Sequence, residues 1–183
     1  MSRWRLGARS VSPWKCRFAL VVRHATAADA EAIARIHVRT WQVAYAHVFP
    51  QEELASLSVE RRVEGWRRAL GERGEPVLVA ERDGQVAGFA SAGPSREEGG
   101  VGELYAIYVE PDAWGTGLGR ELMREVERRL LADGYEQAEL WVLEDNPRAR
   151  RFYEAAGWEP GDMRPIAVFG TEVPEIRYRK RLT

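Results

Sequence analysis

The sequence predicts a single α/β domain in which helices flank a mixed central sheet. An apolar strand at 103–109 leads through a glycine-rich turn into an amphipathic helix that begins at residue 118. A second strand at 138–143 leads into a short, capped helix. Strands that alternate with helices in this way are typical of α/β folds. A chain of 183 residues that is 45% hydrophobic suits one well-buried core and is short for two.

The N-terminal part of the domain is predicted to hold one strand and two helices. Residues 18–24 alternate as a first strand does. Thr26 is an N-cap candidate for a helix that runs to Tyr45, and a second helix is expected at about 58–70. The strand and the helix that follows it therefore begin the folded domain of residues 18–183.

A hairpin is predicted next, and two further strands close the domain. Residues 77–81 and 86–92 are separated by a turn that contains Asp83-Gly84, and Asp-Gly is a strong cue for a tight hairpin. The closing strands are expected at Val168 and at 175–179, after a long connection from Trp158.

The segment from Val109 to Arg120 reads Val-Glu-Pro-Asp-Ala-Trp-Gly-Thr-Gly-Leu-Gly-Arg and predicts an anion cradle at a helix N-terminus. Backbone N–H groups converge there, and the helix dipole adds about 0.3–1 kcal/mol for a favourable charge. No Lys-Ser or Lys-Thr pair follows the last glycine, which argues against a nucleoside triphosphate loop. The chain is still helical about 20 residues on, where a dinucleotide-binding motif would place a ribose-binding acid. A diphosphate fits the cradle best.

The second capped helix begins with Asn146 as its N-cap and Pro147 at the first helical position, and Gly157 is its left-handed stop. Residues 146–158 match the pattern N-x-x-A-x-x-x-Y-x-x-x-G-[FW] at every position. Residues 114–119 match Q/R-x-x-G-x-G/A except at Trp114, which stands where Gln or Arg is usual. These two motifs, in this order, resemble those of the GNAT N-acetyltransferase superfamily.

The resemblance implies the acetyltransferase fold, with the sheet splayed between strands 103–109 and 138–143 and with acetyl-CoA in the gap. It implies an N-acetyltransferase that catalyses direct attack of an amine on the thioester in a ternary complex. The backbone of the first strand is expected to hydrogen-bond the pantetheine arm like an added strand. The cofactor-binding residues that it implies are Ile107, Tyr108, Val109, Trp114, Gly115, Thr116, Gly117, Leu118, Gly119, Arg120, Asn146 and Tyr153.

Two residues are candidates for catalysis. Glu103 lies 14 residues before Gly117, where the histone-acetylating branch of the superfamily has its catalytic glutamate. It is the candidate base, because a lysine-like amine is almost fully protonated at pH 7. Tyr153 is the matched tyrosine of the second motif and the candidate general acid. The alternatives are a solvated glutamate at a strand end and a core tyrosine that packs beside Phe152.

The acceptor is expected to bind at residues 35–70, with Trp41, Tyr45 and Glu103 as substrate-binding candidates. The aromatic residues of this segment are equally compatible with the core. Four acidic residues crowd the same segment, and they are Glu52, Glu53, Glu60 and Glu64. They favour a small-molecule or peptide acceptor that is cationic or zwitterionic, although a solvated acidic helix face explains them too.

Composition bounds the function further. Residues 1–17 carry five basic residues and no acidic one, so a net charge of −1 overall leaves −6 on the remainder. We expect a disordered tail and no nucleic acid partner. No run approaches the roughly 18–20 apolar residues of a membrane span, and the single Cys16 makes an intrachain disulfide impossible. The three histidines are too scattered for a metal site. A cytoplasmic, bacterial protein, monomeric or homodimeric, is expected.

Two alternatives stay open at this point. The donor is acetyl-CoA or another acyl-CoA such as succinyl-CoA, because the side chains beside the thioester are not identified by the motifs. A non-catalytic sensor that binds acyl-CoA is the second alternative. The presence of both Glu103 and Tyr153 favours an enzyme.

Overall fold

The computed structural model describes residues 20–71 and 76–183. The predicted tail at 1–17, with Cys16, and the first two positions of the predicted strand at 18–24 lie outside the described residues.

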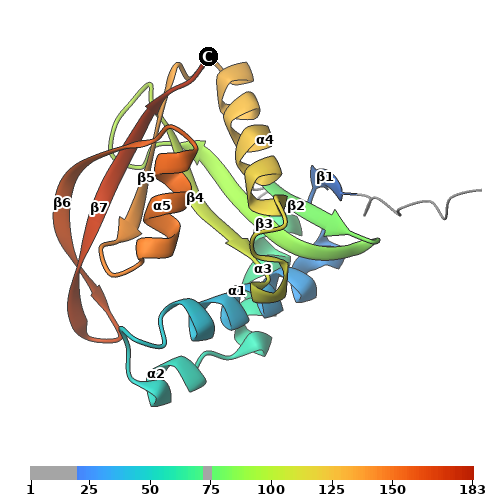
Figure 1. Cartoon of the computed structure of the whole chain (residues 1–183). Helices are drawn as coiled ribbons and strands as arrows, with labels where there is room; N and C mark the ends of the chain where they lie inside the picture. The colour runs from blue at the N-terminus through green and yellow to red at the C-terminus, as the bar shows by residue number, and fades with distance from the viewer. Residues whose placement is uncertain (1–19, 72–75) are drawn as a thin grey trace, which may run out of the picture.

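A seven-stranded sheet in the order β1-β2-β3-β4-β5-β7-β6 forms the centre of the domain (Figure 1). Neighbouring strands are antiparallel except for β4 and β5, so the sheet is mixed as predicted. The strands are β1 Leu20–His24, β2 Val77–Arg82, β3 Gln85–Pro94, β4 Gly102–Val109, β5 Gln137–Leu143, β6 Glu159–Val168 and β7 Thr171–Arg181. The α-helices are α1 Ala30–Ala44, α2 Gln51–Ala55, α3 Val59–Gly71, α4 Leu118–Ala132 and α5 Pro147–Ala155, and short 3-10 turns stand at Ala27–Asp29 and Pro111–Ala113.

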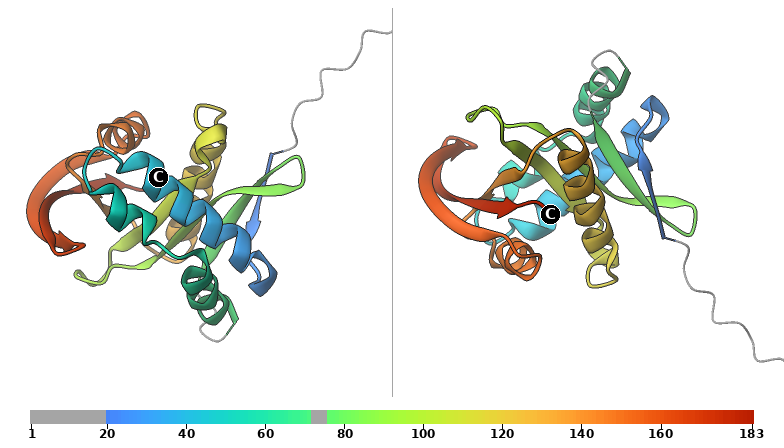
Figure 2. Two further views of the ribbon diagram at one scale, coloured as in Figure 1. Left: turned by 90° about the horizontal axis from the view of Figure 1, so that it is seen from below. Right: turned by 90° about the horizontal axis from the view of Figure 1, so that it is seen from above.

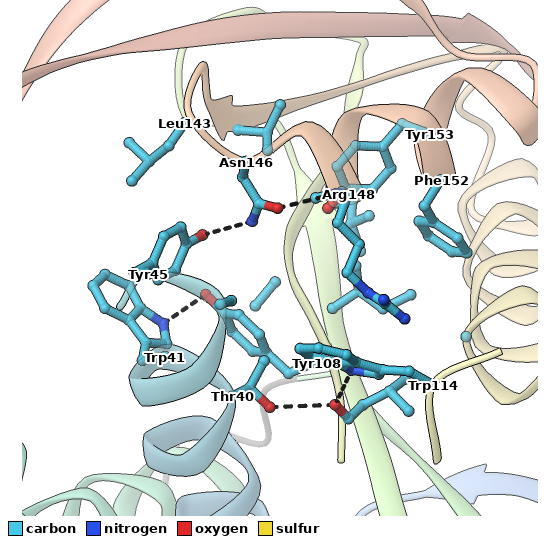
Figure 3. Close-up of a pocket in the computed structure, with 18 of the residues that line it drawn as sticks. Thr40, Trp41, Tyr45, Tyr108, Trp114, Leu143, Asn146, Arg148, Phe152 and Tyr153 are labelled. Atoms are coloured by element: carbon cyan, nitrogen blue, oxygen red, sulfur yellow. Dashed lines mark hydrogen bonds between the residues drawn. The ribbon is translucent and has the colours of Figure 1, made fainter. Parts of the chain in front are cut away.

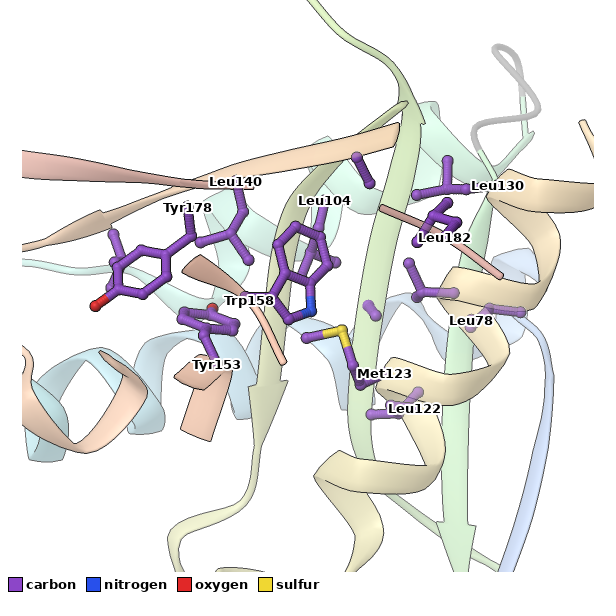
Figure 4. Close-up of a cluster of buried hydrophobic side chains, with 14 of the residues drawn as sticks. Leu78, Leu104, Leu122, Met123, Leu130, Leu140, Tyr153, Trp158, Tyr178 and Leu182 are labelled. Carbon is purple, nitrogen blue, oxygen red and sulfur yellow. The ribbon is translucent and has the colours of Figure 1, made fainter. Parts of the chain in front are cut away.

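The helices cover both faces of the sheet. Figure 2 shows α1 in front of the sheet in one view and α4 in front of it in the opposite view. The core under α4 contains Met123, which packs with Leu104 of β4 and Trp158 (Figure 4). On the other face, Ile33 and Ile36 of α1 pack with apolar residues of β2 and β3. Each helix therefore buries the apolar stripe that its sequence shows.

Local sequence signals set the element boundaries. The backbone N–H of Ala149 donates to Asn146 Oδ1 at 3.0 Å, so Asn146 is the N-cap of α5. Asp83 and Gly84 have φ of 56° and 78°, and they form the two-residue hairpin turn between β2 and β3. The amphipathic helix predicted from residue 118 is present as α4, and its buried apolar residues are Leu118, Leu122, Met123, Val126 and Leu130. These predictions are confirmed.

The connection predicted from Trp158 to Val168 is wrong, because these residues form the edge strand β6. β6 pairs with β7 from Glu159 to Val168, with one irregularity. Pro160 and Pro165 hid the strand, since proline argues against a central strand but is tolerated at an edge. The short helix α2, which starts after Pro50, was also not predicted.

The sheet opens between its two halves. β4 and β5 are paired only at Gly102 with Ala138 and at Glu103 with Glu139. Beyond Glu103 the strands diverge, and Figure 1 shows β4 and β5 separating toward α1. The splay implied by the resemblance is therefore present, and one edge of β4 has no strand partner there.

Candidate active site

A pocket of about 530 Å³ lies in the gap between β4 and β5 (Figure 3). Residues of α1, β4, the glycine turn, β5 and α5 line it, and Ile166, Val168 and Glu175 add the far wall. Charged side chains are unevenly placed around it. Arg120, Arg148 and Arg151 come from α4 and α5, and Glu175 of β7 is the one acidic side chain among the described residues that line the pocket. The pocket thus has a basic end and an acidic end.

The glycine turn forms an open cradle at the basic end. Gly115 and Gly117 have φ of 76° and 93°, a region that favours glycine. A Cβ added at either residue would meet no other atom within 4 Å, so the space over the turn is free. Gly117 is the N-cap of α4, and the first N–H groups of that helix lie beside this space. Such a turn can hold a phosphate group.

A stacked pair supplies a cation beside the cradle. Trp114 Nε1 donates to the carbonyl of Val109 at 2.8 Å, which fixes the indole. The guanidinium carbon of Arg148 lies 3.9 Å from the centre of a Trp114 ring, a cation–π contact (Figure 3). The first motif normally has Gln or Arg where this chain has Trp114. Arg148 therefore places a positive charge next to Trp114, which carries none itself.

The backbone N–H groups of β4 point alternately toward β3 and toward the open gap. Glu110 N–H donates to the carbonyl of Ala87, and Tyr108 is the direct partner of Phe89 on β3. Because successive residues of a strand point their backbone groups to opposite sides, the N–H groups of Ile107 and Val109 face the gap. The backbone of Tyr108 belongs to the β3 ladder, contrary to its predicted place on the pantetheine arm. Its side chain lines the pocket instead.

Three tyrosine hydroxyls come together between α1, β4 and α5 (Figure 3). Trp41 Nε1 donates to the Tyr108 hydroxyl at 3.0 Å, and Asn146 Nδ2 donates to the Tyr45 hydroxyl at 3.3 Å. The Tyr153 hydroxyl has no hydrogen-bond partner in the part of the chain that the structure describes. Burial raises the pKa of all three phenols, so they stay protonated and available as donors.

Glu103 does not line the pocket, so the geometry does not support its predicted roles as base and substrate-binding residue. Its buried carboxylate accepts from the backbone N–H of Arg96 at 2.9 Å and is ion-paired with the Arg96 guanidinium. Glu103 also pairs with Glu139 where the sheet is closed. Spacing along the chain put it at the start of the cofactor strand, but the gap opens only from Leu104 onward.

Other predicted residues divide into two groups. Trp41, Tyr45, Asn146 and Arg120 line the pocket with the three glycines. The N–H and hydroxyl of Thr116 both bind the carbonyl of Ala113, and the side chain of Leu118 lies in the core. The four acidic residues at 52, 53, 60 and 64 do not line the pocket.

Two charged residues that line the pocket, Glu175 and Arg148, were not predicted from the sequence. Arg148 could have been found as an arginine two residues after the N-cap Asn146, whereas no local sequence pattern marks Glu175.

His37 stacks on the ring of Tyr108 with 4.9 Å between ring centres, behind the pocket wall. Burial, with a smaller contribution from Arg62, lowers the pKa of His37 to about 3, so its ring is neutral at physiological pH.

Within residues 20–71 and 76–183, no cluster of three or more His, Cys, Asp and Glu side chains is arranged to hold a metal ion. None of the described helices is long and apolar enough to cross a membrane.

Residues 30–158 match the acetyltransferase (GNAT) family. The chain is 38% identical over 161 residues to the uncharacterized N-acetyltransferase YuaI of Bacillus subtilis (strain 168), which covers 86% of this chain and 90% of that protein. It is 36% identical over 137 residues to the mycothiol acetyltransferase of Streptomyces avermitilis, covering 74% of this chain but only 39% of that enzyme.

Solved structures show the same fold. The ribosomal-protein-alanine N-acetyltransferase from Brucella melitensis superposes with a TM-score of 0.69 at 29% identity, covering 88% of this chain and 99% of that one. YncA from Salmonella typhimurium, solved with its cofactor acetyl-CoA, has a TM-score of 0.69 at 25% identity and covers 90% and 95% of the two chains. The pocket described above thus lies in a fold that binds acetyl-CoA in a relative.

Proposed function

Because this chain belongs to the acetyltransferase (GNAT) family, it is an acyltransferase, and we propose that it moves an acetyl group from acetyl-CoA to a primary amine of a small molecule or peptide. One observation carries the proposal. A single gap holds a free strand edge, an open glycine cradle with a cation beside it, and a phenol whose hydroxyl has no hydrogen-bond partner among the described residues.

The basic end suits the coenzyme. The N–H groups around Gly117 would hold the diphosphate, and the guanidinium groups of Arg120 and Arg148 would neutralise its charge. The N–H groups of Ile107 and Val109 would pair with the pantetheine arm as a neighbouring strand does. Bound there, the coenzyme supplies the thioester that is attacked.

The residues around the reaction centre would act by donating hydrogen bonds. The amine nitrogen forms a bond to the carbonyl carbon, the carbon–sulfur bond breaks, the nitrogen loses one proton and the sulfur gains one. The Ile107 N–H is placed to stabilise the carbonyl oxygen as it becomes negative. Tyr153, held neutral by its raised pKa, donates to the departing sulfur.

Water would accept the proton of the amine, because Glu103 is ion-paired outside the pocket. For a lysine-like amine the neutral form costs about 4.6 kcal/mol at pH 7, but for an α-amine only about 1 kcal/mol. An amine with a low pKa is therefore the easier acceptor for this site.

Calorimetry on the full chain with acetyl-CoA and succinyl-CoA, together with thiol release in the presence of a panel of amines, tests the proposal. We expect acetyl-CoA to bind and thiol to be released only when an amine is present. Binding without turnover across the panel would indicate a sensor, and faster turnover with succinyl-CoA would change the donor. Absence of acetyl-CoA binding would remove the proposal.

A further inference from the structure

Glu175 is a buried carboxylate that faces the pocket at the end away from the cradle. Its residue is 6% exposed and lies on β7, where it pairs with Leu143 of β5. Leu143 comes three residues before Asn146, the N-cap of the helix that carries Tyr153. The Asn146 N–H donates to the carbonyl of Leu143 at 3.0 Å, so Glu175 lies across the sheet from the turn that leads into this helix. The carboxylate belongs to the pocket wall that β6 and β7 form, and not to the glycine cradle at the start of α4.

The charge of Glu175 is only partly compensated. Its Oε1 accepts from Arg164 Nε at 2.6 Å, while Oε2 has no hydrogen-bond partner among the described residues. Arg164 is shared, because its guanidinium is also ion-paired with Glu97. Two carboxylates thus face one guanidinium, and the group of three carries a net charge of −1. A further cation at the free oxygen would balance it.

Aromatic rings line the same pocket as this carboxylate. The guanidinium carbon of Arg164 lies 3.7 Å from the centre of a Trp141 ring, so the chain itself already seats a cation between this indole and Glu175. Trp141 also lines the pocket, and Trp41 and Tyr45 line it from α1. Arg177 lies farther, 5.6 Å from the Trp141 ring, and is ion-paired with Asp162 and Glu139. Its charge is therefore compensated without Glu175.

We propose that Glu175 binds a second positively charged group of the acceptor, separate from the amine that is acetylated. This inference rests on the proposed function. The acceptor class that it names is an amine with a cation at its far end, such as a diamine or an amino-terminal segment that contains a basic side chain. A carboxylate that served only as a counter-ion for Arg164 would not distinguish acceptors by the charge of their far end.

Three four-carbon amines of matched length test this directly: 1,4-diaminobutane, 4-amino-1-butanol and 4-aminobutanoate. They carry a cation, a neutral group and an anion at the far end. Thiol release from acetyl-CoA is measured for the wild type and for Glu175→Gln. We expect the wild type to prefer the diamine. In Glu175→Gln, the KM for the diamine should rise about 10- to 100-fold, the range for a hydrogen bond to a charged group, and kcat should change little.

Glu172→Gln is the matched control. Glu172 lies on the same strand, is exposed, and does not line the pocket, so its removal changes the net charge equally. Its KM values should stay at those of the wild type. Glu175→Asp keeps the charge and should recover most of the affinity for the diamine, which gives a second variant if Glu175→Gln folds poorly.

Equal use of the three amines by the wild type, or equal KM values in Glu175→Gln and Glu172→Gln, would overturn this role of Glu175 and leave the proposed function standing. Release of no thiol with any of the three amines would also overturn it. Calorimetry with acetyl-CoA on the same samples then shows whether the proposed function fails as well.

Discussion

The two ends of the pocket differ in whether backbone or side-chain groups form most of their lining. At the proposed coenzyme end, the backbone of one continuous segment, from the β4 edge to the first turn of α4, lines the pocket, and Arg120 and Arg148 add charge. At the proposed acceptor end, the lining consists of side chains from separate elements, with Trp41 on α1, Trp141 on β5 and Glu175 on β7. Under the proposed function, the coenzyme would thus be held mainly by backbone geometry, whereas the acceptor would be held by side chains, which can change without altering the fold.

The largest effect is expected from a side chain placed in the coenzyme end. Gly119 lines the pocket, and a Cβ there would meet Phe152 and Val109 only at ordinary contact distances. Gly119→Glu should therefore fold but lose at least about 100-fold in acetyl-CoA affinity, because a carboxylate enters the phosphate cradle. Calorimetry measures this. Ala132→Glu at the exposed far end of α4 adds the same charge and should bind normally. Equal affinities in the two variants would contradict the cradle assignment.

Removal of one hydroxyl tests the junction between the two ends. Tyr153→Phe should lower kcat about 100-fold and leave the acetyl-CoA affinity nearly unchanged, since the phenol donates to sulfur only as the bond breaks. The raised pKa of Tyr153 keeps it protonated, so the variant should keep the wild-type shape of the pH profile between about pH 6 and 10. Tyr178→Phe, whose hydroxyl binds Glu154 outside the pocket, is the control. Equal kcat in both variants would make Tyr153 a packing residue.

A smaller effect is expected from the side chain that reinforces the coenzyme end. Arg148→Ala should weaken acetyl-CoA binding about tenfold and make it less dependent on salt. The control is Arg124→Ala, because Arg124 is an exposed residue of α4 paired with Glu121 and lies outside the pocket. Combining Arg148→Ala with Trp114→Leu should cost less than the sum of the two, since each depends on the other in the stack. Additive losses would show that Arg148 acts without Trp114.

Signals confined to a few neighbouring residues were predictable from the sequence. The cap at Asn146 and the buried stripe of α4 belong to this kind, because each depends on local spacing. The splay of the sheet followed from the family resemblance alone. Glu103 was misplaced because distance along a strand does not reveal where the sheet opens. Glu175 was not predicted, because its neighbours Leu143 and Arg164 lie beside it only when β5, β6 and β7 pair in the sheet.

The one-sided pairing of β4 has a consequence for amide exchange with solvent deuterium. A strand in the middle of a sheet normally protects every amide, yet here the Tyr108 N–H is bound within the β3 ladder while those of Ile107 and Val109 face the open gap. In the free protein, exchange should be slow at Tyr108 and faster at its two odd-numbered neighbours. An occupant that pairs with the edge would slow those two amides and leave Tyr108 as it was. The exchange rates of three successive amides would then report occupancy of the gap without any enzymatic assay.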